Sequence, residues 1–170
     1  KDFEKESDAE TFLQQAQTTE FKVLNVETRP GTRTASAPFT TSTLQQEASS
    51  RLGYNVTTTM RLAQRLYEEG FITYMRTDSV NLSQEAINGA KAQILSEYGE
   101  NYSKPRNYTT KSSSAQEAHE AIRPTDFSVK TVGDAQLNKL YQLIYRRTLA
   151  SQMENAKIEK TVIEIGNPKL

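Results

Sequence analysis

Helical periodicity fills the middle of this chain, and a β-like run lies on each side of it. Apolar residues recur at intervals of three and four through 40–149, which indicates helices. Phe21–Arg29 and Ile158–Ile165 are instead rich in β-branched residues, which indicates strands. The order predicts a helical domain inserted into a discontinuous β domain. We expect an α+β fold, mainly α, in three segments: 1–37 and 156–170 in the β domain, and 38–155 in the helical domain.

The N-terminal segment combines a helix signal with a hairpin signal. Ser7-Asp8-Ala9-Glu10 fits a capping box, so we expect a helix that begins after Ser7 and ends near Gln17. Pro30-Gly31 is a turn signal directly after the first β-like run. We therefore expect Thr32–Ser36 to be the returning strand of a hairpin.

Two short helices with a tight connection come next. A capping box can form at Ser42 with Gln45 or at Thr43 with Gln46, and both options stay open. Gly53 should end the first helix. Thr57 or Thr58 should cap the second helix, and Gly70 should end it. The expected inward positions are Leu44, Ala48, Leu52, Met60, Ala63, Leu66 and Tyr67. With Phe71–Met75 as a strand, the pattern is typical of a helix-turn-helix followed by a strand.

The rest of the helical region carries two further helices and two weaker segments. Ser83 should cap a helix whose stripe is Ile87, Ala90, Ile94 and Tyr98. Asp134 should cap the strongest helix, with Leu137, Leu140, Tyr141, Ile144, Tyr145 and Leu149 facing inward. Between them, 101–113 is polar and predicts a mobile loop. Ser114 and Glu117 predict a short helix that ends at Pro124.

Composition excludes several kinds of chemistry. The chain has no cysteine and only one histidine, His119, so disulfides, thiolate sites and histidine-based metal clusters are excluded. Phosphate-loop, dinucleotide-binding, metalloprotease and esterase motifs are all absent. Lys+Arg and Asp+Glu both number 21, so nucleic-acid binding would need a local cluster of cations. There is no membrane-spanning run and no signal peptide, so we expect a cytoplasmic protein.

Tyr74 and Arg76 form the first candidate site. On an extended segment, residues two apart point to the same side, so both side chains could reach one phosphate. A tyrosine that attacks a phosphodiester needs a cation near the non-bridging oxygens, and a guanidinium offers a bidentate fork. Tyr-x-Arg also occurs by chance, and a tyrosine on a strand is more often a packing residue. The pattern alone therefore leaves both interpretations open.

His119 and Arg123 form the second candidate site. On the expected short helix they lie four residues apart and share a face, so they could grip a phosphate. Histidine could also move a proton near neutral pH. The alternative is an ordinary solvated helix with a partly buried histidine.

The helix-turn-helix supports a different function, that of a winged-helix DNA-binding module without catalysis. Its recognition helix would offer Arg61 and Arg65 to the DNA. Glu68 and Glu69 at the end of that helix weigh against this alternative.

Three runs of residues resemble a known family when taken together. They are Pro38-Phe-Thr-Thr-Ser-Thr-Leu-Gln-Gln-Glu47, Gly70-Phe-Ile-Thr-Tyr-Met-Arg-Thr-Asp-Ser79 and Ala115-Gln-Glu-Ala-His-Glu-Ala-Ile-Arg-Pro124. They resemble the bacterial topoisomerase I branch of type IA DNA topoisomerases, in order and in approximate spacing. The run Leu140–Met153 also resembles the helix that leads out of that family's catalytic domain.

The resemblance implies a fold and a mechanism. It implies a helical, catabolite-activator-like (winged-helix) domain with the catalytic tyrosine, carried on a β domain that forms an arch. Tyr74 would attack DNA and hold the 5′ phosphate, and Arg76 would stabilise that phosphate. His119 and Arg123 would bind or position the strand. Thr77, Asp78 and Ser79 would shape the DNA-binding site.

The resemblance also implies parts that this sequence lacks. Family members hold Mg²⁺ in an acidic domain, so we expect no metal ligands here and an inactive piece of a longer polypeptide. The start at Lys1 without a methionine fits the same expectation. The expected partners are single-stranded DNA and the remaining domains of the polypeptide, without ATP or a membrane. The expected location is the bacterial cytoplasm, in association with the nucleoid.

Overall fold

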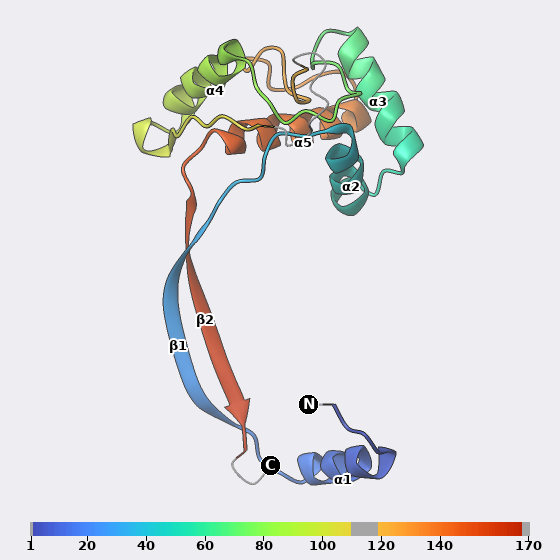
Figure 1. Ribbon diagram of the computed structural model, residues 1–170, viewed down its shortest axis with the longest axis vertical. Coiled ribbons are helices and arrows are strands. Elements are labelled where there is room, and N and C mark those ends of the chain that lie inside the picture. Colours follow the sequence, from blue (N-terminus) through green and yellow to red (C-terminus); the bar gives the residue numbers. More distant parts are fainter. Residues whose placement is uncertain (1, 110–118, 168–170) are drawn as a thin grey trace. The chain divides into compact units, whose positions relative to one another are not determined.

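A computed structural model describes residues 2–109 and 119–167. The chain divides into two compact units (Figure 1). The first consists of Lys1–Arg33 with Ala156–Leu170 and is called the ribbon unit below. The second, Thr34–Asn155, is called the helical unit. The fold is therefore α+β and mainly α, as the sequence predicts.

Two long antiparallel strands make up most of the ribbon unit. Strand β1 (Lys22–Arg33) pairs with β2 (Ala156–Gly166) along its whole length. The predicted turn at Pro30-Gly31 is wrong, because Pro30 lies within β1 opposite Glu159. In a two-stranded ribbon each strand has a free edge, where a residue without an N–H group is tolerated. The predicted returning strand at Thr32–Ser36 is therefore also wrong: Thr32 and Arg33 continue β1, and 34–38 is an unpaired connection.

The ribbon unit also contains helix α1 (Glu6–Gln17), which ends where the sequence predicts. The predicted capping box is wrong. Lys5 precedes the helix and makes no side-chain cap, and Ser7 lies inside the first turn, where its carbonyl accepts from the Thr11 hydroxyl at 2.8 Å. Glu6 and Asp8 place negative charge at the helix N-terminus, which favours an earlier start.

The helical unit contains four α-helices within its described residues (Figure 1). They are α2 (Thr41–Leu52), α3 (Val56–Glu68), α4 (Gln84–Glu97) and α5 (Ala135–Ser151), and a short 3-10 helix, η1 (Glu100–Tyr102), follows α4. Ser83 and Asp134 cap α4 and α5, as predicted. Gly53 ends α2 in the left-handed conformation, with φ of 67°, also as predicted.

The caps of α2 and α3 lie two or more residues before the predicted ones. Thr40 caps α2 in a capping box with Thr43, and Asn55 caps α3. Several hydroxyls in a row could cap α2, and the fold selects among them. Phe39 is fully buried and its carbonyl accepts from Ile122 N at 2.9 Å, which keeps the chain extended up to Thr40.

Helix α5 supplies the centre of the core, with α2, α3 and α4 packed against it. All six of its predicted inward residues are buried. Tyr67 and Tyr98, which we predict to face inward, are instead 43% and 48% exposed. Each packs against a tyrosine outside its own helix, Tyr74 and Tyr102 respectively, rather than against the core.

The loops of the helical unit differ most from prediction. Phe71–Met75 is not a strand, because only Ile72 forms a bridge, with Pro124. Within the described part of this unit, pairing is limited to isolated bridges, so the winged-helix arrangement is not supported. The segment expected to be a mobile loop is anchored at Lys104, Arg106 and Tyr108, which donate to Gln152 O at 2.9 Å and to Ser151 O at 3.1 and 3.2 Å. Its last part, 110–113, lies outside the described residues. The predicted helix start at Ser114 and Glu117 lies outside the described residues.

Among residues 2–109 and 119–167, no helix is long and apolar enough to span a bilayer.

Candidate active site

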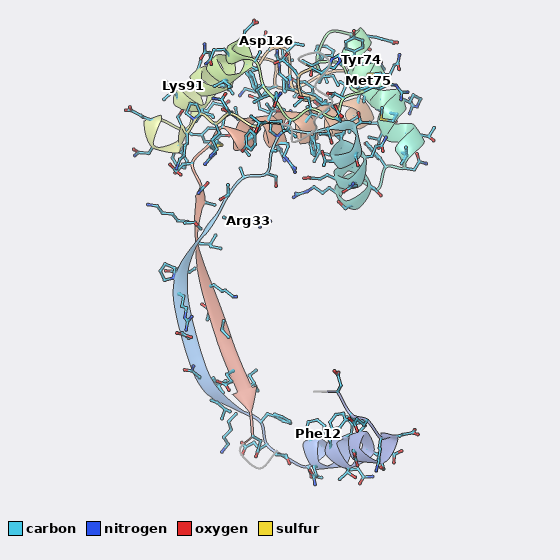
Figure 2. The ribbon with its side chains drawn as sticks, in the orientation of Figure 1. Phe12, Arg33, Tyr74, Met75, Lys91 and Asp126 are labelled. Atoms are coloured by element: carbon cyan, nitrogen blue, oxygen red, sulfur yellow. The ribbon has the colours of Figure 1, made fainter. Side chains whose placement is uncertain are left out.

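Tyr74 lies in the loop that follows α3, between two anchored neighbours. Ile72 and Met75 are 1% and 2% exposed and belong to the core, whereas Tyr74 is 47% exposed. Arg76, the next residue but one, is exposed as well. Figure 2 shows Tyr74 and Met75 side by side beside α3. The loop therefore presents the phenol and the guanidinium to solvent while the residues between and before them hold it to the core.

Thr73 fixes the backbone immediately before Tyr74. Its hydroxyl donates to Ala121 O at 2.7 Å and accepts from Arg123 N at 3.0 Å. Its own N–H donates to Arg123 O at 2.9 Å. These three hydrogen bonds join the Tyr74 loop to the segment 121–123, which is distant in the sequence.

The segment 119–123 is extended, so the predicted helical pairing of His119 with Arg123 is wrong. Its N–H groups bond to distant carbonyls instead of to their own helix: Ala121 N donates to Asn81 O at 2.8 Å and Ile122 N donates to Phe39 O. Tertiary hydrogen bonds here override the local helix signal. His119 itself is exposed.

Arg123 is buried and already engaged. One guanidinium nitrogen pairs with Glu120 at 2.7 Å, and another donates to Pro124 O at 3.1 Å. Glu120 in turn accepts from Ser83 N at 2.6 Å. Burial alone would raise the pKa of Glu120, but the hydrogen bonds from Arg123 and Ser83 outweigh it and lower the pKa. The Arg123 guanidinium is thus engaged by groups within the chain.

The residues after Arg76 turn the loop back toward α2. Thr77 N donates to the Thr41 hydroxyl at 2.9 Å, and Thr41 N returns a bond of the same length to Thr77 O. The Thr77 hydroxyl accepts from Ser79 N at 3.1 Å, and Ser79 is buried. Asp78 is exposed between them. Thr77 and Ser79 thus shape the loop, and Asp78 is the member of the three that is open to solvent.

Helix α3 contributes neighbours that the sequence pattern did not place beside Tyr74 and Arg76. The Tyr67 ring meets the Tyr74 ring edge-on, with 5.2 Å between centroids. Beside Arg76 lies an open hollow of about 480 Å³, whose wall on α3 includes Arg61 and Gln64. Gly70, with φ of 82°, reverses the chain so that α3 and the loop lie together. The glycine was visible in the sequence, but the side-chain contact it permits was not.

Of the two arginines that α3 would offer to DNA as a recognition helix, one is already paired within the chain. Arg65 is held by Glu69 and by Asp134, each at 2.7 Å, whereas Arg61 is exposed. As to metals, no group of three acidic or histidine side chains is placed to hold an ion in the part of the chain that the structure describes.

Comparison with known proteins agrees with the motifs around this site. The sequence profile of the DNA topoisomerase family matches residues 1–169. The chain belongs to the type IA DNA topoisomerase family. Among the curated topoisomerases, DNA topoisomerase 1 of Zymomonas mobilis is 54% identical over 147 residues, which is 85% of this chain and 12% of that protein. DNA topoisomerase 1 of Escherichia coli is 50% identical over 152 residues, 86% of this chain and 18% of that protein.

A solved topoisomerase structure also resembles the chain. Full-length topoisomerase I of Thermotoga maritima matches with a TM-score of 0.73 and 37% identity, over 95% of this chain and 28% of that one. The chain thus spans less than a third of the topoisomerases that it matches here.

Proposed function

We propose that this chain is the tyrosine-bearing part of an ATP-independent type IA topoisomerase, with Tyr74 as the nucleophile that cleaves one DNA strand. The observation that carries the proposal is the placement of Tyr74, which is 47% exposed between residues anchored in the core. The Tyr74 ring contacts another exposed tyrosine, Tyr67, edge-on, so the phenol stays open to solvent. The family assignment supports the same conclusion.

The proposed step exchanges one phosphate ester for another. The Tyr74 oxygen attacks phosphorus, the bond from phosphorus to the 3′ oxygen breaks, and the phenol proton ends on the released 3′ hydroxyl. The tyrosine then holds the 5′ phosphate, and the reverse reaction reseals the strand. Because an ester replaces an ester, no ATP is consumed. Arg76, exposed two residues away, would stabilise negative charge on the non-bridging oxygens.

His119, Thr77, Asp78 and Ser79 would complete the DNA-binding side of the site. For Arg123 we propose the positioning role that its pairing with Glu120 supports. Mg²⁺, if the parent enzyme uses it, would be held by residues outside this chain. The substrate would be single-stranded regions of negatively supercoiled DNA, in the bacterial cytoplasm at the nucleoid.

Tyr74→Phe in the intact enzyme tests the nucleophile. We expect relaxation of supercoiled DNA to fall below detection, because phenylalanine has no oxygen to attack phosphorus, while circular dichroism and DNA binding are retained. Tyr102→Phe, which alters a tyrosine that is 54% exposed outside the site, is the matched control and should stay active. A fully active Tyr74→Phe enzyme would favour the alternative, a DNA-binding module without catalysis.

The isolated chain should not cleave DNA. We expect no covalent adduct when it is incubated with an oligonucleotide that traps the tyrosine-linked product, because a phenol without its proton acceptor and metal is a poor nucleophile. The measurement is a mobility shift on a denaturing gel, with the intact enzyme as positive control. An adduct formed by the isolated chain and lost in its Tyr74→Phe variant would contradict this expectation.

A further inference from the structure

A cationic surface separate from the Tyr74 site lies in the helical unit, in a hollow between α2 and α5. The hollow has a volume of about 580 Å³ and is also bordered by Ala35 and Ser36. Its charged lining residues are Glu47, Arg51, Lys139, Arg146 and Arg147, four cations and one carboxylate. None of its lining residues belongs to the Tyr74 loop or to 119–125. In a chain with a formal net charge of zero, this is a marked local excess of positive charge.

The carboxylate of Glu47 does not cancel that excess. One of its oxygens pairs with Arg51 at 2.8 Å and the other pairs with Arg147. Arg147 is only 19% exposed, donates to Ala37 O at 2.6 Å and stacks on the Phe39 ring, so its role is structural. Arg51 keeps 66% of its side chain exposed despite the pairing.

Lys139 and Arg146 remain as the uncommitted cations of the hollow. Both are exposed, and neither forms an ion pair with any residue that the structure describes. They lie seven residues apart on α5, with Gln142 between them, and all three border the hollow. Positions separated by three, four and seven fall on one face of a helix, so the two charges form a stripe about two turns long.

We infer that the α2–α5 hollow binds the phosphodiester backbone of DNA, at a place separate from the strand that Tyr74 attacks. A stripe of cations spaced along a helix suits a ligand with repeated negative charges, whereas a small anion would be satisfied by one end of it. DNA as the occupant rests on the proposed function. The site carries no chemistry: Lys139 and Arg146 neutralise phosphates and release counterions.

The test is the salt dependence of DNA binding by the intact enzyme with Lys139→Ala and Arg146→Ala combined. The probes are a labelled single-stranded oligonucleotide and a labelled duplex. Each lost phosphate contact lowers the slope of log K against log salt by about 0.9 for duplex and about 0.7 for a single strand. We therefore expect a slope smaller by about 1.8 or about 1.4, and roughly tenfold weaker binding at low salt.

The matched control combines Lys91→Ala on α4 with Lys160→Ala on β2, two exposed lysines that do not border the hollow. It removes the same charge and should leave the slope unchanged. Equal loss in both variants would show a general charge effect and overturn the inference, as would an unchanged slope in the hollow variant. A third outcome would also overturn the inference: millimolar inorganic phosphate competes with DNA, while the slope of log K against log salt is the same in the hollow variant and the wild type. The hollow would then bind a small anion.

The outcome is independent of the proposed cleavage. Tyr74→Phe should abolish relaxation but keep the full salt slope. If Tyr74→Phe were active, the proposed nucleophile would be wrong, while the slope of the hollow variant would still decide whether the hollow binds DNA.

Discussion

The side chains next to Tyr74 determine how it is presented. Ile72 and Met75 are buried in the core, and the hydroxyl and N–H of Thr73 both form hydrogen bonds with 121–123. The phenol therefore rests on a backbone that is fixed on both sides. Such pre-organisation would matter for the proposed role of Tyr74 as nucleophile, because a small displacement from the reacting phosphorus can cost a large factor in rate.

Replacing Thr73 tests that anchor. Thr73→Val keeps the branched shape but leaves Ala121 O and Arg123 N without their side-chain partner, so we expect a loss of roughly 1–2 kcal/mol in the free energy of unfolding. Cleavage by the intact enzyme should slow as well, through the rate constant rather than the apparent affinity for DNA. The measurements are chemical denaturation and single-turnover cleavage. Thr73→Ser, which retains the hydroxyl, should recover most of both, and a Val variant that behaves like wild type would exclude the anchoring role.

Among the elements, the segment 119–125 connects three parts of the helical unit that are far apart in the sequence. It bonds to Phe39 before α2, to the loop at 71–73 and to Asn81 before α4. Its Glu120 accepts from Ser83, the residue that caps α4. Because the backbone groups of this segment form hydrogen bonds with other parts of the unit, they are satisfied without helical hydrogen bonds, and the segment is extended.

Glu120 should make the stability of the helical unit depend on pH. Its pKa is lowered in the folded protein, so its stabilising contribution is present above the pKa of the unfolded chain and is lost as pH falls through the folded-state value. We expect Glu120→Gln to destabilise the protein near neutral pH, with the difference from wild type shrinking below about pH 4.5. The measurement is the urea denaturation midpoint of both proteins from neutral pH to below about pH 4.5. Glu10→Gln on α1 is the control, and a constant difference at every pH for Glu120→Gln would contradict the linkage.

On the scale of the whole molecule, the two units are stabilised in different ways. The helical unit has a core of fully buried side chains such as Leu44, Leu66, Ile94, Leu140 and Tyr141. In the ribbon unit every described residue of β1 and β2 is exposed or only partly buried. Two-stranded ribbons without a covered face are marginally stable in water.

Amide hydrogen exchange should therefore separate the two units. In the isolated chain, we expect amides of β1 and β2 to exchange at least tenfold faster than those of α5, because opening the ribbon exposes little additional apolar surface. Exchange measured by mass spectrometry on peptides from both units is the test. Equal protection of the ribbon and α5 would contradict it.

The sequence by itself determined the local elements and the candidate residues. Periodicity placed α4, α5 and the two strands, and Ser83, Gly53 and Asp134 marked helix limits, because these signals depend on neighbours within one turn. The three motif runs resemble the family without reference to any tertiary contact. The spacing of Tyr74 and Arg76 left a packing role open, and the companion motifs favoured the catalytic one.

Only the tertiary structure decided which of those residues contact one another. The fold made 119–123 extended, turned Arg123 inward to Glu120 and ran β1 through Pro30-Gly31, since distant hydrogen-bond partners outweigh local propensity. It brought Tyr67 to Tyr74 and four cations to one hollow between α2 and α5. Contacts of this kind join residues that are far apart in the chain, so no window of sequence contains them.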